Sequence, residues 1–284
     1  MSYGAHNDGA GDNYTAVQNA MNACAAAGGG TVYMPSGTYR FTGGKDLPTT
    51  ADAVMKVNIA VPTGVTLAGD GIGKTIIVDA SPESGINCIG SMSNNVGVRD
   101  LTVTVAVGEQ PSTWKDGVKL AGVNGAAITN VRVENNYLGM NLIGCSNITL
   151  TGCTAYNART GFMVDMQATF WTCNTVTFSY CEASHTNDPS GGIPYGFAIY
   201  ANGGSDSVRL NNVTLDHCYS HDNENGGIYS KWTNRLTVTN TRIENNEWGF
   251  YVINSKDYYS SGNSATGNTN NALPYNGGNS TARL

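Results

Sequence analysis

The sequence predicts an all-β chain coiled into a right-handed parallel β-helix. Its composition, a repeat near 22 residues and alternating strand patterns all favour that fold. Charged residues make up 13% of the 284 residues, and glycine occurs 36 times. Many short strands joined by tight turns are typical of such a composition, whereas a helical bundle would be richer in Leu, Glu and Lys.

The repeat is marked by a glycine that opens an apolar segment, and successive glycines are 22, 22, 35, 31 and 22 residues apart. Each unit carries a second strand of alternating apolar residues, and Asn-rich turns close several units. This pattern indicates one solenoid coil per unit, because a leucine-rich repeat of similar period would need a Leu/Asn template that the chain lacks. The glycines are Gly117, Gly139, Gly161, Gly196, Gly227 and Gly249.

The two long units carry insertions. Six extra residues fall near 166–175, seven near 185–195 and eight near 201–209, so they surround the strands that Gly161 and Gly196 open. Solenoids tolerate insertions at their corners, where such loops often build a binding face. We therefore predict a binding site at these two neighbouring strands.

An N-terminal piece precedes the coils. Residues 15–25 have the spacing of a short amphipathic helix that ends at Gly28–Gly30, and residues 31–40 read as two strands around a Pro-Ser-Gly turn. The helix is expected to cover the open end of the solenoid, since bare strand edges promote aggregation. We expect one domain over 1–284, with the cap and first strands at 1–45, coils at 46–260 and a C-terminal cap or tail at 261–284.

The cysteines take their meaning from the repeat. Three of them occupy the same position in successive coils, so we expect them to stack inward as a ladder of buried free thiols, with no metal site. The shared column comprises Val131, Cys153, Cys181, Cys218 and Thr241.

Charge and hydropathy exclude several partners. The net charge is −6 and there is no Lys/Arg run, which argues against a nucleic-acid partner. No apolar stretch is long enough to span a membrane. The first residues hold no charged-then-apolar signal region.

The N-terminal piece resembles the opening of the pectate lyase superfamily domain, which occurs in phage tailspikes, in secreted polysaccharide enzymes and in mannuronan C5-epimerase modules. The matching residues run from Tyr3-Gly-Ala through Asp8-Gly, Asp12 and Thr15-Ala-Val-Gln18 to Gly28-Gly-Gly-Thr-Val-Tyr-Met-Pro35-Ser-Gly-Thr-Tyr39-Arg. The resemblance implies a right-handed β-helix that acts on a polysaccharide. It also implies a secreted protein or phage-particle component, either a monomer or a tailspike-like trimer.

The epimerase modules read Tyr-Gly-Phe-Asp-Pro-His in their catalytic coil, where this chain reads Leu138-Gly-Met-Asn141-Leu-Ile143. Their Gly-Phe-Val-Ala-Asp matches Gly161-Phe-Met-Val-Asp165, and a lysine of theirs corresponds to Lys115. The resemblance therefore supports Asp165 as a site residue and leaves epimerase chemistry without its tyrosine, acid and histidine.

Alternation within each glycine-opened strand assigns the second and fourth positions after the glycine to the outer face. Asp165, Tyr200 and Lys231 then share one outward column on three consecutive coils, each about 5 Å from the next. His185 and Asp188, on a loop entering the Gly196 strand, are expected to hang over this column. The alternative is a solvated Asp–Tyr–Lys ladder that contributes a few tenths of a kcal/mol per pair.

The column favours uronate chemistry. A lyase must neutralise a carboxylate, remove the adjacent proton and protonate the leaving oxygen. Tyr200, whose pKa the nearby Lys231 would lower, is expected to act as base, acid or both. Asp165 is expected to hold Lys231 or Tyr200 in place, to help neutralise the carboxylate if Asp165 is itself protonated, or to ligate a Ca²⁺, and His185 is a rival base. No other cofactor is expected. The predicted substrate-binding residues are Lys115, Lys119, Asn141, Gln167, Asp188, Tyr195, Tyr229, Trp232 and Tyr251.

We therefore expect a lyase that cleaves a uronate-containing polysaccharide such as alginate or pectate. Three alternatives stay open. One is an enzyme like the mannuronan C5-epimerases. Another is a glycosidase or tailspike-type depolymerase, which needs two carboxylates about 5–9.5 Å apart, such as Asp165 and Asp188. The third is a non-catalytic carbohydrate-binding adhesin that uses the Tyr/Trp face.

Overall fold

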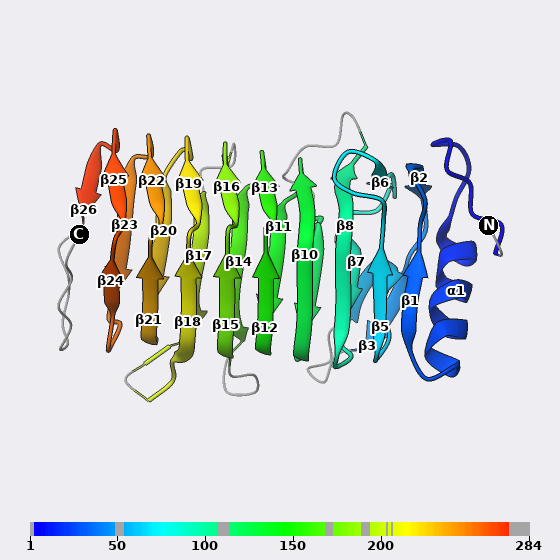
Figure 1. Ribbon diagram of the computed structural model, residues 1–284, viewed down its shortest axis with the longest axis horizontal. Helices are drawn as coiled ribbons and strands as arrows, with labels where there is room; N and C mark the ends of the chain where they lie inside the picture. Colours follow the sequence, from blue (N-terminus) through cyan, green and yellow to red (C-terminus); the bar gives the residue numbers. More distant parts are fainter. Residues whose placement is uncertain are drawn as a thin grey trace.

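The computed structural model describes residues 3–48, 54–106, 114–167, 173–188, 194–202, 204–205 and 207–272. In these residues each coil pairs in parallel with the next, so that the strands stack side by side along the long axis (Figure 1). The predicted right-handed parallel β-helix with an N-terminal helix is confirmed. The predicted insertions fall partly on 168–172, 189–193, 203 and 206, which lie outside the described residues.

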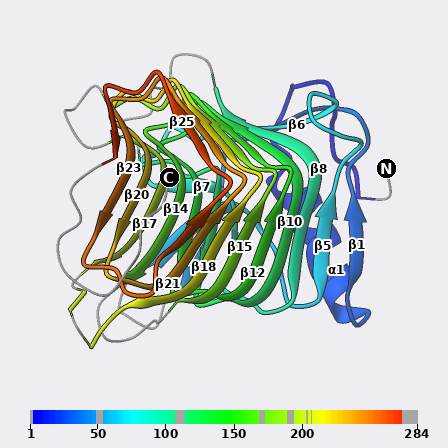
Figure 2. The same ribbon diagram turned by 60° about the vertical axis from the view of Figure 1, so that its left-hand side comes forward.

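The glycine-opened strands form one wall of the helix, which is a ten-stranded sheet within the described residues. Figure 2 shows β14, β17, β20 and β23 superposed along this wall. Its strands are β3 (Lys45–Pro48), β4 (Val54–Ala60), β7 (Ile86–Ser91), β9 (Val118–Ala121), β11 (Leu138–Ile143), β14 (Thr160–Gln167), β17 (Tyr195–Asn202), β20 (Gly226–Lys231), β23 (Trp248–Ile253) and β26 (Asn270–Ala272). Strand β3 runs antiparallel to β4, and the later strands pair in parallel.

A second, bent sheet forms the other two walls. The long strand β10 (Asn124–Glu134) joins them, because its first half pairs with β12 and its second half with β13. The remaining coil strands of this sheet are β8 (Val96–Val105), β12 (Ser146–Thr151), β13 (Thr154–Tyr156), β15 (Asn174–Ser179), β16 (Glu182–Ser184), β18 (Leu210–Asp216), β19 (Tyr219–His221), β21 (Thr233–Thr239), β22 (Arg242–Glu244), β24 (Tyr259–Ser261) and β25 (Ser264–Thr266).

The N-terminal helix α1 (Tyr14–Ala26) covers one end of the stack, as predicted (Figure 1). Gln18 satisfies the backbone of the covered end, because its side chain donates to the Ala60 carbonyl at 3.2 Å and accepts from the Ala60 amide at 3.0 Å. The helix is followed by β1 (Gly30–Tyr33), β2 (Gly37–Phe41), β5 (Val65–Ala68) and β6 (Thr75–Asp79). None of the helices in the described residues has the length and apolar character to cross a membrane.

Each repeat opens on glycine because neighbouring coils approach closely there. A Cβ built on Gly139 would lie well under 3.0 Å from the Gly161 carbonyl oxygen, and one on Gly161 would meet Gly196 in the same way. Real Cβ atoms do not come this close to backbone oxygens. The column of glycines is therefore a steric requirement of coil stacking.

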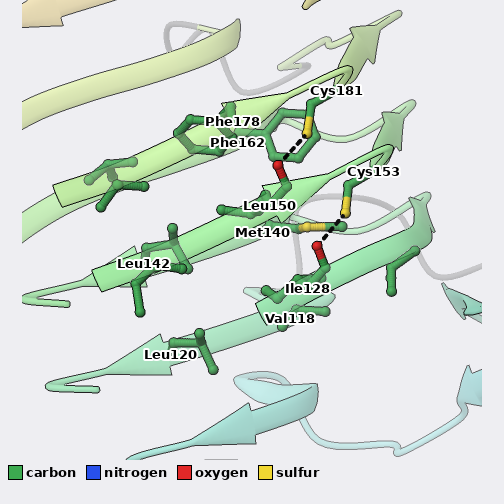
Figure 3. Packing of buried hydrophobic residues seen from close by; sticks show 14 of the residues in the cluster. Val118, Leu120, Ile128, Met140, Leu142, Leu150, Cys153, Phe162, Phe178 and Cys181 are labelled. Atoms are coloured by element: carbon green, nitrogen blue, oxygen red, sulfur yellow. Dashed lines mark hydrogen bonds between the residues drawn. The ribbon is translucent and has the colours of Figure 1, made fainter. Parts of the chain in front are cut away.

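The core confirms the predicted inward columns. Phe162 and Phe197 stack with ring centroids 4.8 Å apart, and Phe178 meets both edge-on at 5.6 Å. Cys153 and Cys181 are buried free thiols on successive coils, where they donate to the carbonyls of Ile128 and Leu150 (Figure 3). Cys218 continues the column, so the predicted ladder of free thiols is present. Packing of Phe162 and Phe197 holds β14 and β17, the strands that carry Asp165 and Tyr200.

Candidate functional site

The predicted column of three side chains is present. Asp165 on β14 lies in register with Tyr200 on β17, and Tyr200 lies in register with Lys231 on β20. Tyr200 and Lys231 line a pocket of about 650 Å³ on the outer side of this sheet. Asp165 points away from the core but is only 4% exposed. The column therefore consists of a covered carboxylate beside a tyrosine and a lysine that reach open space.

Tyr200 does not have the acidic phenol that the sequence suggested. Burial, together with the negative charge of Asp165, raises the pKa of Tyr200 to about 12. The nearby Arg159 opposes this rise, and Tyr229 and Tyr137 add to it. Tyr200 is thus a protonated phenol at neutral pH, suited to donate a proton.

The pocket holds a second tyrosine whose neighbour is a cation. The Tyr137 hydroxyl accepts a hydrogen bond from Nη1 of Arg159, and the guanidinium carbon lies 4.7 Å from the Tyr137 ring centroid. Nε of Arg159 donates to the carboxylate of Asp188. Burial raises the pKa of Tyr137, while the charge of Arg159 opposes that rise. The cation–tyrosine pair expected at Lys231 and Tyr200 is therefore found at Arg159 and Tyr137.

Aromatic side chains make up much of the pocket wall. Tyr195 and Tyr229 stack with centroids 4.6 Å apart, and Tyr251 meets Tyr229 edge-on at 5.4 Å. Tyr195 and Tyr229 line the pocket, whereas Tyr251 lies one coil further along. Rings of this kind give flat apolar surfaces with polar edges, as sugar faces require.

Two tryptophans stand in the pocket wall with left-handed backbone conformations. Trp114 has φ 56° and Trp232 has φ 57°, values that bulky side chains rarely adopt. Trp114 is 65% exposed and stacks on Tyr137 at 4.5 Å, and Arg209 lies over the Trp232 ring at 5.0 Å. Trp232 shares this conformation with Asn254, which stands at the same corner of the next coil, so its φ follows from the coil geometry.

Several predicted substrate-binding residues do not line this pocket. Lys115 is buried against Asp79, with Nζ 3.5 Å from Oδ2, and it donates to the Ser81 carbonyl at 2.6 Å. Lys119 pairs with Asp116 at 3.0 Å, and Asn141 donates to the same carboxylate at 2.8 Å. This corrects the expectation that the two lysines supply the positive charge of the site. Arg159 and Lys231 line the pocket instead.

The remaining predicted residues separate. His185 lies 5.1 Å from Tyr156 and 6.1 Å from His221 by ring centroids, on the wall formed by β13, β16 and β19, so it does not overhang Asp165. Asp188 is directed at Arg159 and its side chain is 2% exposed, which places it behind the pocket wall. Gln167 pairs in register with Asn202, but its side chain lies outside the described residues.

Sequence reasoning missed Tyr137, Arg159 and Trp114. Tyr137 and Arg159 stand two positions before Gly139 and Gly161, so extending the aligned columns backwards from the glycine would have paired them. No sequence signal distinguished Trp114. In the described residues, no group of three or more His, Cys, Asp or Glu side chains is arranged to hold a metal ion.

Comparisons with known proteins agree with the fold. Residues 1–95 match the family described as rhamnogalacturonase A/epimerase, pectate lyase-like, and residues 71–281 match the family described as periplasmic copper-binding protein (NosD). Mannuronan C5-epimerase AlgE5 of Azotobacter vinelandii is 29% identical over 84% of this chain and 26% of its own length. Alginate lyase 7 of the same organism is 33% identical over 58% of this chain and 20% of its own length.

Among solved structures, the A-module of mannuronan C5-epimerase AlgE6 from Azotobacter vinelandii superposes with a TM-score of 0.67 at 22% identity. The match covers 92% of this chain and 74% of that one. The chain thus spans about a quarter or less of the length of the two curated relatives above.

Proposed function

The chain belongs to the pectate lyase-like β-helix family and, over residues 71–281, to the NosD family; on this premise we propose that it modifies a uronate polysaccharide such as alginate by epimerisation at C5. The sequence favoured a lyase, with epimerisation as an alternative. The relatives favour the alternative, because the epimerase AlgE5 matches 84% of the chain and the alginate lyase 58%.

The observation that carries the proposal is one pocket lined by two tyrosines with opposite electrostatic neighbours. Epimerisation breaks the C5–H bond on one face of the sugar and forms a new one on the other. It therefore needs a proton acceptor and a proton donor on opposite sides of the ring. Tyr137, in the bend just before β11, and Tyr200, on β17, line the same space.

The roles follow from the charges. Arg159 favours the phenolate of Tyr137, so we assign Tyr137 the removal of the C5 proton. The electron pair of that bond moves into the uronate carboxylate, whose negative charge the cations Arg159 and Lys231 balance. Burial and the charge of Asp165 keep Tyr200 protonated, so Tyr200 returns a proton to C5 from the opposite face. The aromatic wall holds neighbouring sugar units.

The direct test is incubation with polymannuronate in deuterated water. We expect deuterium at C5 and inverted units in the NMR spectrum, without ultraviolet absorbance from unsaturated uronate and without new reducing ends. Growth of that absorbance would make the protein a lyase, and new reducing ends alone would make it a hydrolase. The Tyr200→Phe variant should lose about a hundredfold or more in rate. Tyr259→Phe, on the exposed face of β24, is the matched control.

A second candidate is carbohydrate binding without catalysis. It is favoured by the coil that resembles the epimerase catalytic coil, where the chain carries Leu138, Asn141 and Ile143 in place of tyrosine, acid and histidine. A binding protein would retain polymannuronate without deuterium exchange. Asp165→Ala would then leave its affinity largely intact.

A further inference from the structure

We propose that Arg159 is the specificity-determining residue of the pocket: a guanidinium fixed by Asp188 and Tyr137 that binds the carboxylate of one uronate unit. This rests on the proposed function in that it assumes a polyuronate ligand. It adds the residue that distinguishes such a polymer from a neutral one.

Arg159 is held on two sides. Its Nε donates to Asp188 and its Nη1 donates to the Tyr137 hydroxyl, while its guanidinium carbon lies 4.7 Å from the Tyr137 ring centroid. Trp114 stacks on Tyr137, which limits how far the tyrosine can turn. A guanidinium has five N–H donors, and these two bonds occupy two of them. The entropy cost of fixing the Arg159 side chain is therefore incurred when the protein folds, before a ligand binds.

The remaining donors are available to the pocket. The Arg159 side chain is 27% exposed and lines the pocket, whereas Asp188 behind it is 2% exposed. A planar guanidinium matches a carboxylate through two parallel hydrogen bonds, which an ammonium group cannot make. Lys231, on the other side of Tyr200, offers a point charge on a flexible stem. Arg159 is therefore the cation here that can recognise carboxylate shape as well as charge.

A comparable group elsewhere supplies the control. Arg242 on β22 lies 4.3 Å from the Tyr219 ring centroid and pairs with Glu244 at 2.9 Å, so it has the same three components. Its side chain is 58% exposed and lies on a different wall. Removing Arg242 tests the loss of a stacked arginine without touching the pocket.

The experiment measures binding of mannuronate oligomers and of their carboxyl-reduced, neutral counterparts by calorimetry. Arg159→Gln should weaken binding of the acidic oligomer about ten- to a hundredfold and leave the neutral one unchanged. Arg159→Lys should be intermediate. Asp188 positions Arg159, so Asp188→Asn should loosen the guanidinium. This variant should show a smaller preference for the acidic oligomer, and in the C5-exchange assay its KM should rise more than its kcat falls. Arg242→Gln should match the wild type.

The possible results distinguish failure of the Arg159 inference from failure of the proposed epimerisation. An Arg159→Gln protein that keeps the wild-type preference for the acidic oligomer overturns the inference, as does a wild type without any preference. If the wild type prefers the acidic oligomer through Arg159 but exchanges no C5 proton, the proposed chemistry fails and the carboxylate site stands. Near-ultraviolet and far-ultraviolet circular dichroism establish that each variant is folded. If Arg159→Gln does not fold, the Arg159→Lys and Asp188→Asn variants decide the question.

Discussion

The Nζ atom of Lys115 lies 3.5 Å from Oδ2 of Asp79 although the two residues are 36 positions apart, and the side chains are only 2% and 0% exposed. The same Nζ donates to the Ser81 carbonyl at 2.6 Å. The pair joins the end of β6 to the segment before β9, and so connects the N-terminal coils to the regular repeat. A lysine that resembles a substrate ligand in sequence is a structural ion pair in the fold.

Lys115→Met should therefore destabilise the protein strongly. The substitution leaves the Asp79 carboxylate buried without this cation, and breaking a buried pair from one side costs about 3–5 kcal/mol. Denaturant unfolding measures the loss. Lys56→Met, which removes the exposed pair with Glu83, should cost less than about 1 kcal/mol. Equal effects of the two substitutions would contradict a structural role for Lys115.

Thiol labelling of the native protein should be confined to one cysteine. Cys24 is partly exposed, whereas Cys88, Cys145, Cys173 and the ladder cysteines are buried. Burial also raises the pKa of Cys145 to about 12, so its reactive thiolate is scarce. Mass spectrometry after brief maleimide treatment should show one adduct at Cys24, and seven after unfolding. Rapid native labelling of Cys181 would show that the coils open.

The rate of C5 exchange should rise with pH well beyond neutrality. If Tyr137 removes the proton, its raised pKa leaves few phenolates at pH 7, and that fraction grows about tenfold per pH unit below the pKa. The rate should fall again only as Tyr200 ionises near pH 12. Arg159→Gln should move the rising limb to higher pH, since the cation lowers the pKa of Tyr137. A bell centred near neutrality would indicate a different base.

Gly139→Ala should disturb the stack even though alanine is small. Its Cβ would clash with the Gly161 carbonyl oxygen of the next coil, and such overpacking costs about 1–3 kcal/mol. Gly43→Ala is the control, because a Cβ there meets nothing nearer than 4.0 Å and should change stability by less than about 0.5 kcal/mol. Thermal unfolding compares the two, and equal melting temperatures would refute the steric explanation.

The periodic part of the structure was predictable from sequence because register determines it. Once the glycines are aligned, strand alternation places Asp165, Tyr200 and Lys231 in one column. The stacking of coils in register allows few other arrangements of these residues. The inward cysteines follow in the same way. Each of these features depends on contacts between equivalent positions of adjacent coils.

Two of the features that escaped prediction, at Lys115 and Asp188, depend on contacts between non-equivalent positions. Lys115 finds Asp79 in coils that precede the regular repeat, and Asp188 reaches Arg159 from a corner segment of the next coil. His185, in contrast, could have been placed from the alignment, because it stands at the corner that Asn157 and Asp222 occupy in the neighbouring coils, and all three have positive φ.

The close contact between glycines of successive coils has a consequence for how this chain can diverge. Because each coil presents the same edge to the next, a whole 22-residue unit can be lost or duplicated in frame without altering the contacts that hold the stack. Loss of residues 139–160 would set Gly117 against Gly161 and bring Tyr137 into the position of Arg159, beside Asp188. The trio at Asp165, Tyr200 and Lys231 would remain. A single recombination event can therefore change the charge of the pocket.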